Sequence, residues 1–429
     1  MLQTNFIRDN QELTVAGLRK KHFREAESTV ELLLKLDRLR RETQQELDTV
    51  LAQSNAKAKE IGGLMKQGKK EEAEAAKAET SALKERSKVL DEQLKQAESA
   101  LFEELVKLPN LPHESVPEGR SAEDNVTVLE QGEKPELPAG AKPHWELIQS
   151  LGGTSGAMID FELGTKITGA GFPVYKGKGA RLQRAMISFF LDEAARAGYV
   201  EVQPPILVNA DSGFGTGQLP DKEGQMYYAT ADDLYLIPTA EVPITNLYRD
   251  VILTENDLPV KHVGYTPCFR REAGSWGAHV RGLNRLHQFD KVEIVQICKP
   301  EASYAALDAM VEHVKSLLEK LELPFRILRL CGGDMGFTSA LTYDFEVWSG
   351  AQARWLECSS VSNFESYQAN RLKLRYKTEG KTQLLHTLNG SALALPRILA
   401  ALLENNQQAD GSVRIPAVLV PYCGFETID

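Results

Sequence analysis

The sequence lacks the features that mark membrane and secreted proteins. None of its apolar runs reaches the ~18 residues of a bilayer-spanning helix, and the opening residues, MLQTNFIRD, contain no apolar signal-peptide core. Only five cysteines occur in 429 residues, none in a CxxC pair, which argues against a disulfide scaffold and a structural zinc site. We therefore expect a cytoplasmic chain that contacts no membrane and needs no zinc.

The chain also lacks an excess of positive charge. Its net charge of −10 argues against a nucleic-acid coat or a membrane-surface protein, although an acidic body can carry a local basic patch. With 42% hydrophobic and 26% charged residues, the composition is that of an ordinary globular protein. The length predicts two to four folding units.

Proline is absent from residues 28–108, where strong helix formers dominate. Apolar residues recur there at steps of three and four, which predicts two coiled-coil seams. The first seam contains Leu33, Leu36, Leu47, Val50, Ile61 and Leu64, and the second contains Ala76, Leu83, Leu90, Leu94, Ala97, Leu101 and Leu108. Gly68, in KQGKK at 66–70, marks a turn between them. The pattern predicts an antiparallel two-helix hairpin, each helix about 57 Å long at 1.5 Å per residue.

Two interpretations of this hairpin stay open from the segment alone. A structural or dimerisation coiled coil is the simpler one. The other is an arm that reaches a macromolecular partner, with Lys66, Lys69 and Lys70 at its tip available to phosphates.

Changes in composition predict the domain boundaries. We expect an N-terminal domain over residues 1–108, with a small helical cap at 1–27 and the hairpin over about 28–108. Six prolines make residues 109–145 a linker or surface connector. Residues 146–429 mix helix and strand patterns and form the predicted catalytic domain, of the α+β class.

Three separated segments of this body stand out. The first is an amphipathic helix from residue 177 that ends near Gly198, followed by a strand that two prolines stop at 204–205. Alone it indicates packing and no chemistry.

The second segment is a hairpin with a long connecting loop, formed by residues 263–274 and 285–295. Long loops between ordered strands are usually functional. Alternation places Arg270 and Glu272 on one face, and Phe289 and Glu293 on one side of the returning strand with Lys291 between them. Such a set suits a nucleotide, with Arg for phosphate and Phe for stacking on the base. A salt-bridged, half-exposed sheet is the alternative.

The third segment joins residues 354–360 to a glycine turn and an apolar helix at 388–403. Arg397 is the only charge in that apolar stretch. A charge there is costly unless it is paired or touches an anion. The alternative is an arginine at the helix edge that reaches out to solvent.

Together these segments resemble the three motifs of the class II aminoacyl-tRNA synthetases, and more closely the seryl-tRNA synthetase family. The motifs that carry the resemblance are IPTAE (237–241), CFRREAG (268–274), HQFDKVE (287–293), ECSS (357–360) and TLNGS (387–391), together with the predicted arm. Ala392 and Pro396 stand where family members commonly have glycine, and the loop 277–282 lacks their usual Asp-Thr. The resemblance covers essentially the whole chain and implies an antiparallel sheet flanked by helices behind an N-terminal coiled-coil arm.

The resemblance also implies a reaction and a set of site residues. Serine would attack the α-phosphate of ATP to give seryl-adenylate, which then passes to the terminal ribose of tRNA(Ser) and, by the family's usual overlap, tRNA(Sec). The implied serine-binding residues are Thr239, Ala240, Glu241, Arg270, Glu293, Asn389 and Ser391. The implied ATP-binding residues are Arg270, Arg271, Glu272, Phe289, Glu357, Cys358, Ser359, Ser360 and Arg397. Glu357 and Ser360 would hold Mg²⁺, a cation that prefers oxygen ligands.

Individual roles follow from the same resemblance. Arg270 would bridge the serine carboxylate and the α-phosphate as the catalytic residue, and Arg397 would hold the γ-phosphate. Glu272 would contact the adenine amine while Phe289 stacks on the ring. The arm would lie across the partner of a homodimer and read the shape of the tRNA.

Two other functions are compatible with parts of the chain. One is a coiled-coil interaction protein whose enzyme-like body has lost its chemistry; the presence of Arg270, Glu272, Glu357 and Arg397 argues against it. The other is a relative that loads an amino acid onto a carrier protein, which would lack the long arm.

Overall fold

The computed structural model describes residues 1–151, 156–221, 224–272 and 281–429, and it divides into two compact units, Met1–Pro109 and Asn110–Asp429. Along these ranges, no helix combines the length and apolarity needed to cross a bilayer. Loop residues 273–280, which include part of the second motif, lie outside the described residues.

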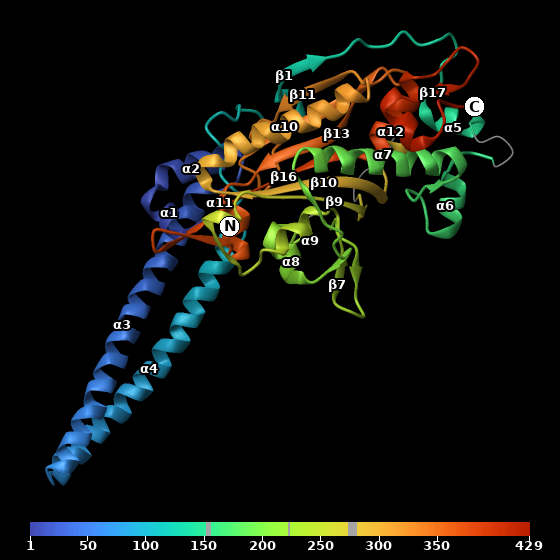
Figure 1. Cartoon of the computed structure of the whole chain (residues 1–429). Helices are drawn as coiled ribbons and strands as arrows, with labels where there is room; N and C mark the ends of the chain where they lie inside the picture. The colour runs from blue at the N-terminus through green and yellow to red at the C-terminus, as the bar shows by residue number, and fades with distance from the viewer. Residues whose placement is uncertain (152–155, 222–223, 273–280) are drawn as a thin grey trace. The chain divides into compact units, whose positions relative to one another are not determined.

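The first unit is helical and contains the arm (Figure 1). Its helices are α1 (Thr4–Asp9), α2 (Gln11–Lys20), α3 (Ala26–Lys66) and α4 (Lys70–Leu105). Helices α3 and α4 pack against each other, with Leu47, Val50, Leu90 and Leu94 forming a buried cluster on their seam. Gly68 stands in the turn between them with φ +74°. The predicted antiparallel hairpin is confirmed.

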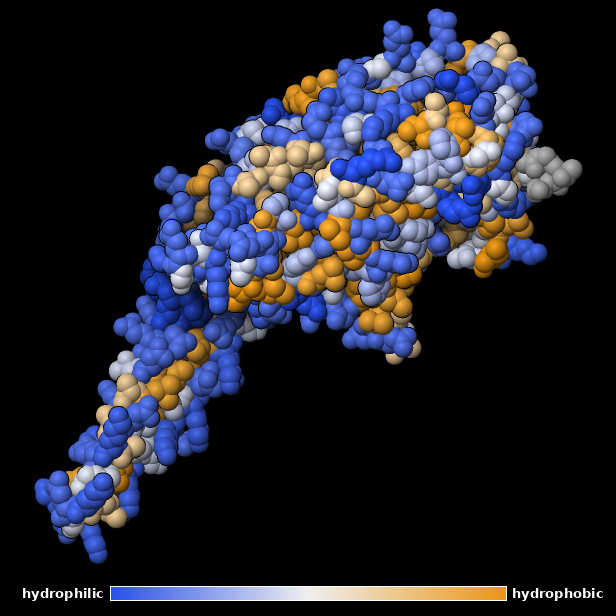
Figure 2. All heavy atoms as spheres, viewed as in Figure 1, coloured by the Kyte–Doolittle hydropathy of each residue, from blue (hydrophilic) through white to orange (hydrophobic). Residues whose placement is uncertain are grey.

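Helix α3 also buries a charged side chain, Asp37. This buried carboxylate accepts hydrogen bonds from Arg8 at 3.3 Å, Arg40 at 3.2 Å and Arg41 at 3.0 Å. Burial alone would raise the pKa of Asp37, but the hydrogen bonds from Arg40 and Arg41 hold it below the ordinary value. Because Arg8 belongs to α1, this cluster fastens α1 to α3. Figure 2 shows the remaining arm surface as mainly hydrophilic, with an apolar stripe along its length.

The second unit is built on an eight-stranded sheet in the order β1-β11-β12-β13-β16-β10-β9-β4. The strands are β1 (Val126–Gln131), β11 (Phe325–Arg329), β12 (Leu341–Ser349), β13 (Arg354–Asn363), β16 (His386–Ala394), β10 (Gln288–Cys298), β9 (Val260–Phe269) and β4 (Val200–Glu201). Every neighbouring pair is antiparallel except β4 and β9. The segment that we predicted as a linker supplies β1, one of the two edge strands, because its VTVLEQ stretch pairs with β11 between proline-rich flanks.

Three long helices, α7 (Gly177–Arg196), α10 (Ser303–Lys320) and α12 (Leu395–Asn405), pack on one face of this sheet (Figure 1). They form the main core with alternate strand residues such as Val292 and Ile294 of β10. Lys291 and Glu293, which alternate with them along the strand, face the other side. This arrangement confirms the antiparallel sheet flanked by helices that the resemblance implied.

Shorter elements complete the second unit. The short helices are α5 (His144–Ser150), α6 (Phe161–Ile167), α8 (Ala210–Thr216), α9 (Glu241–Asn246), α11 (Ser366–Leu372) and α13 (Val420–Cys423). The 3₁₀ turns are η1 (Ala122–Asp124), η3 (Glu255–Asp257), η5 (Gly282–Asn284), η6 (Pro300–Ala302) and η7 (Ala417–Leu419). Small sheets join β2 (Ile159–Asp160) to β3 (Val174–Tyr175), β17 (Val413–Arg414) to β18 (Thr427–Ile428), β5 (Leu207–Val208) and β6 (Tyr228–Ala229) to β7 (Leu234–Leu236), and β8 (Ile252–Thr254) and β15 (Lys381–Leu384) to β14 (Arg375–Thr378).

Candidate active site

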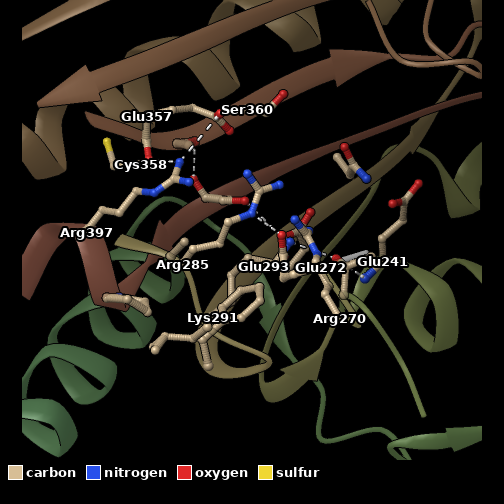
Figure 3. A pocket seen from close by; sticks show the side chains of 18 of the residues that line it. Glu241, Arg270, Glu272, Arg285, Lys291, Glu293, Glu357, Cys358, Ser360 and Arg397 are labelled. Carbon is tan, nitrogen blue, oxygen red and sulfur yellow. Dashed lines mark hydrogen bonds and ion pairs between the residues drawn. The ribbon is translucent and has the colours of Figure 1, made fainter. Parts of the chain in front are cut away.

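A cavity of about 370 Å³ opens on the sheet face opposite the three long helices. It lies over β10, β13 and β16, with residues just before or at the starts of α9 and α12, the end of β9 and the turn η5 at its edges (Figure 3). Its described lining residues are Thr239, Glu241, Arg270, Glu272, Leu283, Asn284, Arg285, Leu286, Phe289, Lys291, Glu293, Glu357, Cys358, Ser359, Ser360, Ser362, Phe364, Asn389, Ser391, Ala394, Pro396 and Arg397. Most of these side chains are polar or charged, so the cavity suits a polar ligand.

Strand alternation and register assemble one end of the cavity. Lys291 and Glu293 point the same way along β10, and Glu293 stands directly opposite Ser391 of β16. The Ser391 hydroxyl donates to Glu293 Oε2 at 3.4 Å. Lys291 Nζ lies 2.6 Å from the same carboxylate oxygen and donates to Thr239 Oγ1 at 2.8 Å. A buried ammonium therefore ties Thr239 to Glu293.

Glu241, the first residue of α9, adds a second carboxylate at this end. It accepts a hydrogen bond from Gln368 Nε2 at 2.6 Å. Burial, reinforced by the charge of Glu293, raises the pKa of Glu241 to about 7. The two carboxylates outnumber the Lys291 ammonium, so this end carries an excess negative charge when both are ionised.

Arg270 lies next to this cluster. Its Nε donates to the Pro238 carbonyl at 3.3 Å, and its guanidinium lies 5.3 Å from the centroid of the Phe289 ring. The strand ends three residues earlier than the alternation argument assumed, because β9 stops at Phe269, before Glu272 with its φ of +49°. Glu272 still lines the cavity, where it pairs with Arg285.

A β-bulge shapes the opposite end. The pairing of β12 with β13 shifts by one residue, so that Glu346 faces Glu357 and Phe345 faces Ser359. The extra residue is Cys358, and the bulge lets Glu357 and Ser360 face the cavity together. Asp344, opposite Ser360, has an Oδ1 atom without a hydrogen-bond partner in the described structure. Burial and the charge of Glu357 raise the pKa of Asp344.

Arg397, the third residue of α12, turns into the cavity and does not reach out to solvent. Its Nη1 donates to the Glu357 carbonyl at 2.7 Å and lies 3.6 Å from Glu357 Oε2, while its Nε donates to the Asn284 carbonyl at 3.0 Å. The arginine is thus held beside the bulge with part of its guanidinium facing the cavity (Figure 3).

Two of the residues predicted for the site do not line the cavity. Ala240 is fully buried just before α9 and places Glu241 through the backbone. The backbone N–H of Arg271 donates to the Gln225 carbonyl, and its guanidinium lies 5.8 Å from the centroid of the Tyr227 ring, so its ATP-binding role stays a prediction. Its side chain lies against Tyr227, outside the lining to which Arg270 belongs.

Sequence reasoning left several lining residues unassigned. Lys291 could have been found, because period two between Phe289 and Glu293 places it on their face. Leu283 and Asn284 carry no such signal, since they lie in the short turn η5. No group of three or more His, Cys, Asp or Glu side chains able to hold a metal occurs within the described ranges.

Comparison with known proteins decides the family. Residues 1–112 match the seryl-tRNA synthetase N-terminal domain, and residues 227–406 match the tRNA synthetase class II core domain (G, H, P, S and T). A serine–tRNA ligase of Salinibacter ruber is 51% identical over 100% of this chain and 99% of its own length, and one of Akkermansia muciniphila is 47% identical with the same coverage. The chain belongs to the seryl-tRNA synthetase family.

Solved structures of the seryl-tRNA synthetase family agree with this assignment. The crystal structure of seryl-tRNA synthetase from Pyrococcus horikoshii complexed with ATP has a TM-score of 0.91 and 34% identity, covering 100% of this chain and 99% of that one. The cytoplasmic serine–tRNA ligase from Naegleria fowleri, in complex with AMP, has a TM-score of 0.87 and 26% identity with the same coverage. As a member of this family, the chain is a class II aminoacyl-tRNA synthetase that uses ATP to activate serine and charges tRNA with it.

Proposed function

We propose that the cavity performs both steps of serine–tRNA ligation, with Arg270 joining a serine subsite to a nucleotide subsite. The observation that carries this assignment is the position of Arg270 (Figure 3). Its backbone continues from β9 beside the Thr239, Lys291 and Glu293 cluster, and its guanidinium lies 5.3 Å from the centroid of the Phe289 ring. A planar, permanently charged group at this junction suits two anions at once, the serine carboxylate and the α-phosphate.

The serine subsite matches a zwitterion. The ammonium of serine would replace the missing positive charge near Glu241 and Thr239, and its carboxylate would face Arg270. Both subsite carboxylates are at most 7% exposed, so their attraction for the ammonium is weakly screened.

Selectivity for serine would come from its hydroxyl. Glu293 and Ser391 already share a hydrogen bond across β10 and β16, and Asn389 lines the same wall. An amino acid without a hydroxyl would leave these buried groups unpaired, which is why hydrogen-bonding sites reject such analogues strongly.

The nucleotide would occupy the rest of the cavity. Phe289 offers a flat face to adenine, Glu272 can accept from the adenine amine, and the backbone around Cys358 and Ser359 lines the wall. Arg397 would hold the γ-phosphate. Glu272 is paired with Arg285 in this structure, so contact with the amine would share or replace that ion pair.

The residues present fit Mg²⁺. The bulge brings the Glu357 carboxylate and the Ser360 hydroxyl to one face, and the Asp344 Oδ1 atom opposite Ser360 has no hydrogen-bond partner among the described residues. One or two protein oxygens completed by substrate phosphates and water are what Mg²⁺ prefers. When bound, the ion would neutralise phosphate charge; Glu357 and Ser360 would hold it.

The chemistry needs no nucleophilic side chain. A serine carboxylate oxygen forms the bond to the α-phosphorus while the bond to the bridging oxygen breaks, releasing pyrophosphate. Arg270 would orient the attacking carboxylate, so catalysis rests on positioning and charge stabilisation. In the second step a ribose hydroxyl of the tRNA attacks the seryl carbonyl and releases AMP.

The second step needs tRNA, which the arm would bind. We propose that residues 28–108 bind tRNA(Ser), and also tRNA(Sec), by backbone and shape, within an N-terminal domain of residues 1–108. The catalytic domain would span residues 146–429, joined by residues 109–145, and the enzyme would act as a homodimer in the cytoplasm. Size measurement in solution and charging of each purified tRNA test these assignments.

The primary test is ATP–pyrophosphate exchange with each of the twenty amino acids. We expect serine alone to support rapid exchange. Exchange without any amino-acid dependence, or with another amino acid preferred, would remove the proposed subsite assignment. Transfer to a carrier protein in place of tRNA would favour the alternative amino-acid loading function.

A further inference from the structure

A carboxylate and an imidazole lie buried behind the wall of the nucleotide subsite. The side chains of His144, at the start of α5, and Glu404, near the end of α12, are both 0% exposed. Neither lines the cavity, and neither belongs to the motifs that suggested the function. Burial alone would raise the pKa of Glu404, but hydrogen bonds from His144 and Ser349 hold it below the ordinary value. A buried carboxylate that stays ionised needs such donors.

The hydrogen bonds of His144 show which ring nitrogen carries its proton. Its Nε2 lies 2.8 Å from the backbone nitrogen of Leu283, which has only a hydrogen to donate, so Nε2 accepts. The proton of the neutral ring is then on Nδ1, which donates to Glu404 Oε1 at 2.7 Å. The His144–Glu404 pair is therefore hydrogen-bonded to the backbone of Leu283, a residue of the cavity wall.

A second branch leads from the same carboxylate oxygen to the next residue. Gln352 Nε2 donates to Glu404 Oε1 at 2.9 Å, and Gln352 Oε1 accepts from Asn284 Nδ2 at 2.9 Å. The carbonyl of Asn284 in turn accepts from Arg397 Nε at 3.0 Å. Glu404 thus holds two consecutive wall residues, and through Asn284 it fixes the arginine.

A glycine at position 282 allows the wall to approach the His144 ring closely. Gly282 has φ +67°, and a Cβ atom built there would lie 2.3 Å from His144 Nε2. Any larger residue would displace either the imidazole or the wall. Arg397 and Glu404 also belong to one helix, α12, so the helix that supplies the arginine also supplies the carboxylate that anchors its partner.

We propose that Glu404 and His144 are positioning residues for ATP, which set the place of Arg397 and of the wall at Leu283 and Asn284. The proposal rests on the phosphate-binding role proposed for Arg397. If the two residues served only to anchor α5 to α12, their substitution would lower the stability of the fold without a selective effect on ATP binding.

The first test measures ATP binding by calorimetry, together with the KM for ATP and the KM for serine, in the full-length Glu404→Gln variant. Gln keeps the side-chain shape but removes the charge that orders both branches. We expect about tenfold weaker ATP binding, the loss of roughly one charge-assisted hydrogen bond, with the KM for serine within twofold. Glu193→Gln is the matched control, because Glu193 is a buried, ion-paired carboxylate outside the cavity lining. An unchanged ATP affinity in Glu404→Gln would overturn the proposal.

Two substitutions of His144 separate its atoms. Gln can place an acceptor near the former Nε2, whereas Asn can place a donor only near the former Nδ1. We therefore expect His144→Gln to keep ATP affinity within about threefold and His144→Asn to lose about tenfold. Equal losses that follow only the melting temperature would contradict positioning through Leu283.

The dependence on Arg397 is tested by a double-mutant cycle. If Glu404 acts through Arg397, Glu404→Gln should cost little further ATP affinity once Arg397→Ala is present. Full additivity would overturn that route. Unchanged ATP binding in Arg397→Ala alone would instead refute the proposed role of Arg397.

Hydrogen exchange on the unaltered enzyme adds a measurement that needs no variant. The Leu283 amide should be strongly protected without ATP, and rapid exchange would overturn the proposal.

Discussion

The arm and the cavity use the same kinds of charged residue in opposite ways. On the arm, Arg86 Nη2 lies 2.5 Å from Glu46 Oε1 across the two helices, and both side chains are 49% exposed. In the cavity, Lys291 Nζ lies 2.6 Å from Glu293 Oε2, with exposures of 6% and 3%. The distances are alike, but solvent screens the first pair and leaves the second almost unscreened.

The difference shows what each region can do with a charge. Exposed pairs on the arm form at little energetic cost and contribute little to stability. Buried pairs in the cavity fix the orientation of a few groups, at a desolvation cost that is tolerable only where hydrogen bonds satisfy every member. The arm therefore depends on periodicity, and the cavity depends on individual side chains.

Arg270→Ala should give the largest effect. Its guanidinium is the cation proposed to contact both reacting groups, so serine-dependent pyrophosphate exchange should fall by about a thousandfold or more. The melting temperature should change little, because within the described part of the chain its side chain donates to the Pro238 carbonyl and lies near the Phe289 ring, with no buried ion pair to break. Exchange within tenfold of the unaltered enzyme would remove Arg270 from the reaction.

Shortening the arm should separate the two steps. Removing residues 51–84 and closing the hairpin with a short glycine turn keeps the buried cluster of Leu47, Val50, Leu90 and Leu94. Pyrophosphate exchange should stay within about twofold, while aminoacylation of tRNA(Ser) should fall by more than about a hundredfold through lost backbone contacts. Charging at the full rate would show that the arm is only structural.

Lys291→Met and Arg86→Met compare the two regions directly. Removing one partner of a buried pair costs about 3–5 kcal/mol, and here it leaves Glu293 uncompensated, so kcat/KM for serine should fall by about a hundredfold. Arg86→Met should change the free energy of unfolding by at most about 1 kcal/mol. Chemical denaturation and exchange kinetics measure both; equal stability losses in the two variants would contradict the comparison.

The arm and the cavity also differ in how much of their structure the sequence predicts. The arm could be predicted almost completely, because its burial repeats every three or four residues and its turn contains Gly68. Asp37 was the exception, since one of the three arginines that donate to this buried carboxylate, Arg8, belongs to another helix.

In the cavity, alternation placed Phe289 and Glu293 together, but it could not place Glu357 with Ser360. Residues three apart on a regular strand face opposite sides, and the bulge at Cys358 that reverses this depends on pairing with β12. Likewise, nothing near Arg271 in the sequence signals that the backbone turns at Glu272. Such non-local geometry also hid the approach of His144 to Leu283.

The smallest effect expected on the serine reaction is a pH dependence that isolates the buried end of the cavity. The pKa of Glu241 is raised to about 7, first by burial and then by the charge of Glu293. Below that pH the empty site holds a proton that the serine ammonium must displace, so the affinity for serine falls as pH falls.

Between pH 8 and pH 6 the KM for serine should rise about tenfold, while the KM for ATP stays nearly constant. In Glu241→Gln the KM for serine should be higher throughout and flat with pH, because the carboxylate that takes up this proton is gone. A flat profile in the unaltered enzyme, or an unchanged slope in Glu241→Gln, would show that Glu241 does not meet the serine ammonium.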